Sequence, residues 1–210
     1  MAELEQELKQ SLAELRKEKE RKFDQSVDLI INLQKFDVKR NPLNLFISLP
    51  HKIKDKKIVG FLEAKNKKVE TITKEEFKKY SDKNELKKLV KRVDFFIAQA
   101  SLMPKVATTF GRVLGPSGKM PSPQMGIMVN VDDKTIDELI KKINSSVKIR
   151  TKEASIKLSV GKQSMKDEEI VENVVAVYNS VLKALLKGKD NVKNIELKFT
   201  MTKPQKIKIR

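Results

Sequence analysis

Residues 111–126, GRVLGPSGKMPSPQMG, hold four of the chain's seven glycines and three of its seven prolines. A Gly-Lys pair in such a segment suggests a phosphate-binding loop, because glycine backbone can point several N–H groups at one anion. A Walker loop also needs a glycine at position 113 and a hydroxyl at position 120, but Val113 and Met120 occupy them. No Gly-x-Gly pair follows a predicted strand either. The residues therefore favour a proline-stiffened loop over a nucleotide cradle.

Residues able to carry out catalysis are scarce. The only histidine is His51, which follows the strand-ending Pro50, and the chain has no cysteine. Nucleophile–histidine triads and zinc sites therefore have little support. The acidic residues lie mostly in mixed-charge helical stretches, the usual pattern of a solvated face. We predict no catalytic residues, no metal site and no cofactor, and hence no enzymatic activity.

The net charge points to a polyanionic partner. Lysine and arginine total 45 against 28 acidic residues, a formal charge of +17, and the final stretch KFTMTKPQKIKIR has five cations and no acid. Cations that neutralise phosphates release condensed counterions, which favours nucleic-acid binding. The alternative is a lysine-rich surface of the kind found on proteins from hot or salty habitats. Because aromatic residues make up 5% and tryptophan is absent, broad base stacking is not expected.

The chain carries no predicted membrane or secretion segment. No apolar run approaches the roughly 20 residues of a membrane span, and the acidic N-terminus does not resemble a signal peptide. The absence of cysteine fits an intracellular setting. We therefore expect a soluble, cytoplasmic protein without a membrane partner.

Hydrophobic periodicity predicts a mixture of helices and strands. Leu4, Leu8, Leu12 and Leu15 form one stripe on an N-terminal helix, and alternating apolar residues over 26–33 indicate a half-buried strand. Further strands are predicted at 43–50, 57–62, 94–100, 147–151, 154–160, 194–201 and 206–209. Further helices are predicted around 74–91, from about 101, over 132–144 and over 166–187.

These elements predict two domains, one of them discontinuous. Residues 1–53 and 148–210 would form an α+β domain with an antiparallel sheet. Residues 54–147 would form a Rossmann-like α/β domain inserted between its strands. The two chain crossings would then act as a hinge near residues 52–55 and 146–148.

Strand alternation predicts which side chains leave the core of the discontinuous domain. If Ile156, Leu158 and Val160 face the core, Lys157 and Ser159 face outward. The same argument turns four more side chains outward on the neighbouring strands: Ser26, Asp28, Lys198 and Thr200. Lysines mixed with small hydroxyls on an open sheet can contact phosphates and 2′-hydroxyls closely. The alternative is an ordinary solvated face.

The segment FFIAQASLMPKVATTFGRVLGPSGKMPSP closely resembles the signature of the universal large-subunit ribosomal protein L-one family, whose archaeal members commonly read LGPRGKMPKP in this loop. Other matching motifs occur in the family's order: FDQSVDLIINL, SLPHK, LSVGKQSM and FTMTKP. The resemblance covers essentially the whole chain and is of the archaeal type.

The resemblance implies a structural protein of the large ribosomal subunit that binds ribosomal RNA at the mobile stalk near the exit site and helps deacylated tRNA leave. It further implies exit-site tRNA as a partner, repression of the protein's own messenger RNA in some members, and a monomer when free. The RNA-binding positions carried over from the family are Phe23, Ser26, Asp28, Lys157, Ser159, Gly161, Lys162, Ser164, Thr200, Met201 and Lys203.

Three departures limit this carry-over. Ser117 stands where the family often has arginine, Thr202 where it usually has glycine, and Asp28 where archaeal relatives commonly have glutamate. A stand-alone RNA-binding regulatory protein with the same fold remains an alternative. A nucleotide-dependent enzyme is a third and more distant one.

Overall fold

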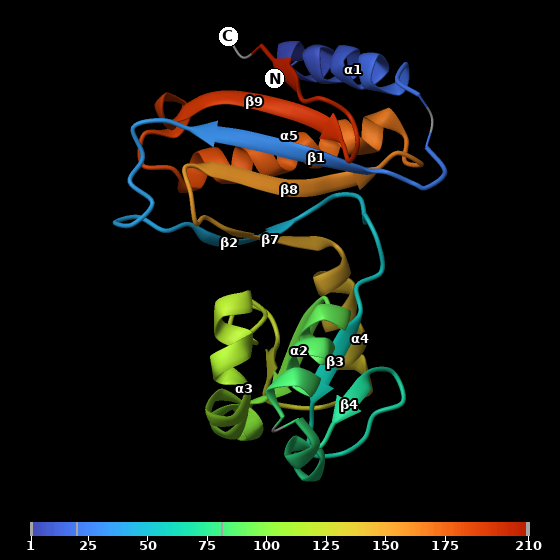
Figure 1. Cartoon of the computed structure of the whole chain (residues 1–210), viewed down its shortest axis with the longest axis vertical. Helices are drawn as coiled ribbons and strands as arrows, with labels where there is room; N and C mark the ends of the chain where they lie inside the picture. Colours follow the sequence, from blue (N-terminus) through green and yellow to red (C-terminus); the bar gives the residue numbers. More distant parts are fainter. Residues whose placement is uncertain (1, 20, 81, 209–210) are drawn as a thin grey trace. The chain divides into compact units, whose positions relative to one another are not determined.

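The computed structural model describes residues 2–19, 21–80 and 82–208. The chain divides into two compact units (Figure 1). Unit 1 combines Met1–Ile53 with Ser145–Arg210, and unit 2 is Lys54–Asn144. Helices and strands are mixed and the strands form several sheets, in agreement with the predicted α+β and α/β class.

The second crossing between the units lies at 144/145, three residues before the boundary placed at 147/148 from the sequence. The reason is a strand pair in unit 1, β2 (Asn44–Ser48) with β7 (Ser146–Arg150). In this antiparallel pair Ser48 lies opposite Ser146 and Ile47 opposite Val147. Residues 146 and 147 therefore belong to the strand rather than to the inserted segment.

Unit 1 is built on a four-stranded antiparallel sheet in the order β10-β9-β1-β8. Its strands are β1 (Ser26–Leu33), β8 (Ser155–Lys162), β9 (Val192–Phe199) and β10 (Gln205–Ile207). The predicted alternation along β1 is observed, since Val27, Leu29, Ile31 and Leu33 are buried. The intervening side chains of β1 are half-buried on the other face.

Helices α1 (Ala2–Arg16) and α5 (Asp167–Ala184) pack on each other and on the apolar side of this sheet, α5 behind β1 and β8 in Figure 1 and α1 near β9 and β10. The stripe Leu4, Leu8, Leu12 and Leu15 is buried in the same core as the strand residues. Burying each leucine contributes about 1.5–3 kcal/mol, whereas a surface ion pair contributes about 0–1 kcal/mol. The leucines therefore hold α1 in place.

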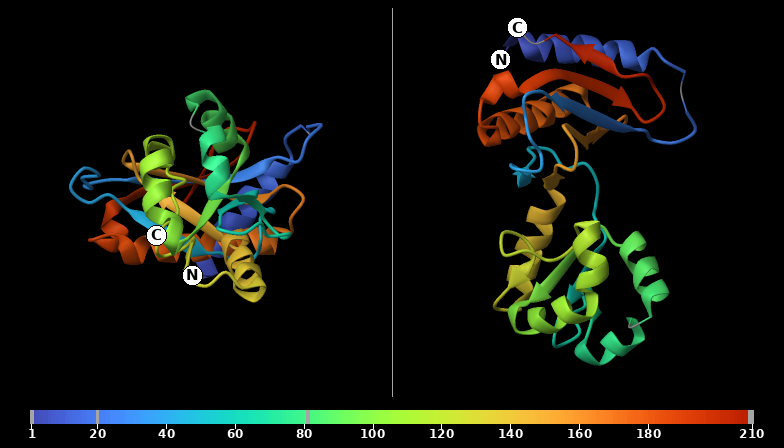
Figure 2. Two further views of the ribbon diagram at one scale, coloured as in Figure 1. Left: turned by 90° about the horizontal axis from the view of Figure 1, so that it is seen from below. Right: turned by 60° about the vertical axis from the view of Figure 1, so that its left-hand side comes forward.

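Unit 2 is a four-stranded parallel sheet in the order β4-β3-β5-β6, with helices on both sides (Figure 2). Its strands are β3 (Ile58–Phe61), β4 (Glu70–Ile72), β5 (Phe95–Gln99) and β6 (Ile127–Met128). Its helices are η1 (Lys74–Tyr80), α2 (Lys83–Arg92), η2 (Ala100–Leu102), α3 (Met103–Ser117) and α4 (Asp133–Asn144). The sequence did not predict the short outer strands β4 and β6.

His51 lies in unit 1 and fastens the first crossing to α5. Its backbone N–H donates to Asn173 Oδ1 at 3.0 Å, and Asn173 Nδ2 donates to the His51 carbonyl at 3.0 Å. The imidazole Nε2 lies 2.7 Å from Glu172 Oε2. At the second crossing, Leu49 N donates to Ser145 O at 2.6 Å. Both crossings are thus anchored inside unit 1, side by side.

Because the crossings are adjacent, we expect unit 1 to fold after residues 54–144 are replaced by a short Gly/Ser linker from Ile53 to Ser145. Closing a short loop costs little, and every strand pair of unit 1 is retained. Circular dichroism during heating should show one cooperative transition. A trimmed protein without cooperative unfolding would show that unit 1 depends on the inserted segment.

Candidate nucleic-acid interface

The face of the unit 1 sheet turned away from α1 and α5 carries a row of polar side chains. The strand register places Asp28 of β1 between Ser159 of β8 and Lys198 of β9, and it places Ser26 opposite Lys162. A register shift after Val27 keeps these outward positions aligned. The predicted outward residues of three separate strands therefore lie beside one another.

Asp28 is the acidic centre of this row. It is half-buried, and desolvation by burial raises its pKa, while the Lys198 ammonium opposes part of that shift. A carboxylate held in such a place can accept hydrogen bonds, and a neighbouring lysine can pair with phosphate. The arrangement offers both an acceptor for a 2′-hydroxyl and a cation for a phosphate.

The loop after β8 is organised by Asp24, a residue that sequence reasoning did not single out. Its carboxylate accepts hydrogen bonds from Ser164 N and Ser164 Oγ, both at 3.1 Å. Its carbonyl accepts a bond from Lys162 Nζ at 3.3 Å. Two of the predicted RNA-binding residues are therefore held in place by the segment that leads into β1.

Arg16 and Gln25 support the same loop and were also not predicted. The Arg16 guanidinium donates to Gln163 O, Met165 O and Asp167 Oδ1 at 2.8–3.0 Å. Gln25 is nearly fully buried and accepts a bond from Met201 N at 3.1 Å. Gln25 lies within the motif FDQSVDLIINL, which was the one available signal, whereas Arg16 lies outside every motif.

Two large apolar side chains are exposed at the Ser26 end of the sheet. Phe23 is 51% exposed and Met201 is 57% exposed. The alternation of β9 would point Met201 toward the core. Because β9 ends at Phe199, Met201 lies in a turn and its side chain is exposed instead. Exposed apolar residues beside lysines suit contact with a sugar or a base edge. Lys203 follows on the same turn and is exposed.

Thr200 is placed at this end as predicted, but its hydroxyl already has a structural role. Thr200 Oγ1 accepts a hydrogen bond from Ser26 N at 3.0 Å and donates to Ser26 O at 3.4 Å. The hydroxyl thus extends the pairing of β9 with β1 beyond the last strand residue. A valine at this position would remove that link as well as any contact with RNA.

Three predicted residues have structural partners that limit a direct role. Gly161 is buried, and an added Cβ would lie 3.0 Å from Ile170 Cγ1, so glycine lets β8 pack closely on α5. Lys157 is exposed, but its ammonium pairs with Glu153 at 2.8 Å. Ser159 Oγ donates weakly to Val27 O at 3.4 Å.

The Gly/Pro-rich loop of unit 2 turns its lysine inward. Lys119 Nζ donates to Val90 O and Val93 O, each at 2.6 Å, at the end of α2. Burial lowers the pKa of Lys119, and nearby Asp94 opposes part of that shift. Gly118 has φ +73° and ends α3 in the left-handed conformation that glycine favours. The prediction of a loop over residues 111–126 is wrong for its first part, because residues 111–117 form the end of helix α3 (Met103–Ser117) and Pro116 is accommodated within it. The inward lysine favours a structural role for the remaining segment.

Two of the residues that depart from the family pattern, Ser117 at the end of α3 and Thr202 after β9, have hydrogen-bond partners within the chain. Ser117 Oγ donates to Leu114 O at 2.9 Å inside α3. Thr202 is nearly buried, and its hydroxyl accepts from Phe199 N at 2.9 Å and donates to Phe199 O at 3.4 Å. Neither side chain is therefore directed to an external ligand.

The described residues contain no cluster of three or more histidine, cysteine or acidic side chains able to hold a metal ion. None of the helices in the described ranges is both long and apolar enough to cross a membrane.

The positive net charge and the open polar face of the helix-backed antiparallel sheet make this surface a candidate nucleic-acid interface. The family model of the Ribosomal protein L1p/L10e family matches residues 15–203, and the chain belongs to that family. This membership confirms the resemblance found in the sequence and the prediction that the protein is not an enzyme.

Curated relatives agree with the family. The chain is 34% identical to the large ribosomal subunit protein uL1 of Nanoarchaeum equitans, with 89% of this chain and 92% of that protein covered. It is 37% identical to the protein of the same name from Thermofilum pendens, with 97% and 92% covered. It is 37% identical to that of Methanococcus voltae, with 87% and 88% covered. All three organisms are archaea, in line with the predicted type.

We expect Lys119→Met to destabilise unit 2, because it leaves the Val90 and Val93 carbonyls without their ammonium donor while keeping a long unbranched side chain. The loss in the free energy of unfolding should be about 1–3 kcal/mol. Urea unfolding followed by circular dichroism measures it. Lys87→Met, on the exposed face of α2, is the matched control and should change stability little. Unchanged stability of Lys119→Met together with weaker RNA binding would contradict the structural assignment of the loop.

Proposed function

We propose that this protein is a structural constituent of the large ribosomal subunit and binds large-subunit ribosomal RNA through unit 1. The observation that carries the proposal is the convergence of apolar, hydroxyl, carboxylate and cationic side chains at one end of the open sheet face. These residues are Phe23, Ser26, Asp28, Ser159, Lys162, Ser164, Lys198, Thr200, Met201 and Lys203.

The proposal includes a division of labour between the two units. Unit 1 is the discontinuous RNA-binding domain and unit 2 is an inserted Rossmann-like α/β domain. The RNA site is the mobile stalk near the exit site, where the protein assists departing tRNA. The same surface of unit 1 would serve for a stalk-like hairpin in the protein's own messenger. The free protein is a monomer that acts on cytoplasmic ribosomes.

Sedimentation tests the ribosomal role directly. The protein should co-sediment with large subunits in a sucrose gradient of a lysate at moderate salt. A stand-alone RNA-binding regulator would instead remain near the top of the gradient with small RNA complexes. The names of the archaeal relatives favour the first outcome.

We expect binding to a stalk RNA fragment to depend steeply on salt. With about 6–10 phosphate contacts, affinity should fall about 10³–10⁵-fold between 50 and 200 mM salt. Lys198→Gln should weaken binding at low salt and reduce the slope by about one, because one phosphate contact is lost. Filter binding at several salt concentrations provides both slopes. If the wild type and Lys198→Gln show the same salt dependence of affinity, Lys198 makes no phosphate contact.

We expect Asp28→Asn to stabilise the free protein while weakening RNA binding. The pKa of Asp28 is raised above its ordinary value of 3.8 by burial, so its ionised form costs stability at neutral pH. That cost shrinks as the pH falls through the raised pKa and is absent below the ordinary value. The gain of the variant in melting temperature should therefore be present at pH 7 and lost in acid.

The RNA affinity of Asp28→Asn tests whether the Asp28 carboxylate contacts the RNA. Loss of a charged acceptor for a 2′-hydroxyl should cost about 1 kcal/mol in binding. Glu196→Gln is the matched control, because it removes another carboxylate from the same sheet face while the Gln oxygen can still accept the hydrogen bond from Asn194 Nδ2. A tighter complex with Asp28→Asn would show that the carboxylate only repels phosphate.

A further inference from the structure

The parallel sheet of unit 2 has a point where its chain connections diverge. In the order β4-β3-β5-β6, the connection after β3 runs to β4 on one side, and the connection after β5 runs to β6 on the other. Ligands of open parallel sheets bind in the crevice formed where such connections leave the carboxyl ends of neighbouring strands. β3 and β5 are paired directly, so the crevice lies beyond Phe61 and Gln99.

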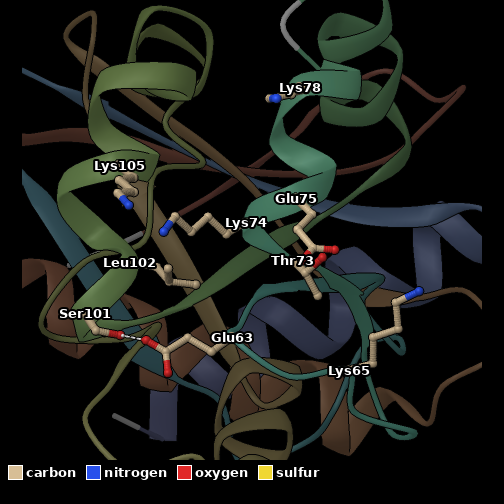
Figure 3. Close-up of a pocket in the computed structure, with 9 residues that line it drawn as sticks. All are labelled: Glu63, Lys65, Thr73, Lys74, Glu75, Lys78, Ser101, Leu102 and Lys105. Carbon is tan, nitrogen blue, oxygen red and sulfur yellow. Dashed lines mark hydrogen bonds between the residues drawn. The ribbon is translucent and has the colours of Figure 1, made fainter.

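A cavity of about 880 Å³ occupies this position (Figure 3). Glu63 follows β3, Thr73 and Lys74 follow β4, and Ser101 and Lys105 follow β5. These lining residues thus lie on the segments that leave the carboxyl ends of the strands, Lys74 in η1 and Lys105 in α3 among them. The volume lies within the usual range of about 300–1,000 Å³ for small-molecule sites.

Two lysines face each other across the cavity without an acidic partner in the described part of the chain. Figure 3 shows the amino groups of Lys74 and Lys105 pointing toward one another. The adjacent Lys74 amino group lowers the pKa of Lys105, and both side chains are exposed to solvent. Two adjacent ammonium groups repel one another unless an anion lies between them.

The acidic residues of the cavity do not neutralise this pair. Glu63 Oε1 accepts a hydrogen bond from Ser101 Oγ at 2.8 Å. The Glu75 carboxylate lies beside Thr73, on the side of Lys74 away from Lys105 (Figure 3). A further lining lysine, Lys65, is already paired with Glu76.

We propose that this cavity binds a small phosphorylated molecule whose phosphate lies between Lys74 and Lys105. Lysines bind phosphate as point charges, and the hydroxyls of Thr73 and Ser101 can bond the polar part of the ligand. The cavity is larger than a single phosphate needs. Its lining residues include no aromatic side chain on which a base could stack. The site therefore recognises the phosphate and the polar group attached to it rather than a base. Pyrophosphate, ADP and GDP should therefore bind with similar affinity.

Titration of the full chain with pyrophosphate, ADP and GDP, followed by amide chemical shifts in NMR, tests the site. The shifts should concentrate at residues 63–65, 73–78 and 101–105. The double variant Lys74→Gln/Lys105→Gln should weaken pyrophosphate binding about tenfold or more. Lys74→Arg/Lys105→Arg should retain it, because the charge is kept.

A charge-matched control excludes general attraction to a cationic protein. Lys87→Gln/Lys91→Gln removes two exposed lysines of α2 outside the cavity and should change pyrophosphate affinity less than about twofold. Equal weakening in the two glutamine variants, or shifts spread over the whole surface, would overturn the proposal. It would also be overturned if the cavity variant kept pyrophosphate binding and lost RNA affinity, since the lysines would then contact an RNA chain. Binding of the stalk RNA by unit 1 should be unchanged, so this proposal and the ribosomal role fail independently.

Discussion

Strand β1 has to bury Val27, Leu29 and Ile31 beneath α1 and α5 while its two neighbours arrive from the far end of the chain. β8 and β9 pair with it on either side and begin more than a hundred residues later in the sequence. Strands so far apart in the sequence pair slowly, because the chain loses loop-closure entropy before their contacts can form. The paired crossings near Leu49 and Ser145 reduce this cost by holding the ends of the inserted segment together. Every functional feature of unit 1 depends on this central strand.

The opposite face of β1 shows how function and stability compete on the same strand. A half-buried carboxylate with a raised pKa at Asp28 weakens the free protein. The turn at Thr200 and the buried Gln25 compensate by fastening the strand ends with hydrogen bonds. The proposed RNA-binding face is therefore pre-organised by hydrogen bonds to the backbone, which would reduce the ordering cost of binding. Such a surface gains affinity from shape as well as from charge.

Lysines in unit 2 occupy two kinds of environment. One is bonded to backbone carbonyl groups inside the unit, and two others line a cavity. Lys119 is turned inward onto carbonyl groups at the end of α2, where it adds to the hydrogen bond made by the C-cap residue Val93. Lys74 and Lys105 line the cavity, and their amino groups point toward one another (Figure 3). The lysine of the segment that first suggested phosphate binding is thus turned inward, whereas the proposed phosphate site lies on charged segments that carry no recognisable motif.

The sequence by itself determined the periodic elements and their buried faces, such as the alternation in β1 and the leucine stripe of α1, because these depend on local geometry. It also determined the cationic character and, through ordered motifs, the family. Only the tertiary structure decided which distant residues meet: Asp24 with Ser164, Gly161 against Ile170, and Lys74 with Lys105. The short strands β4 and β6 likewise form because neighbours pair with them, and two or three residues carry no periodic signal of their own. Contacts between segments far apart in the chain are set by packing, which local pattern does not encode.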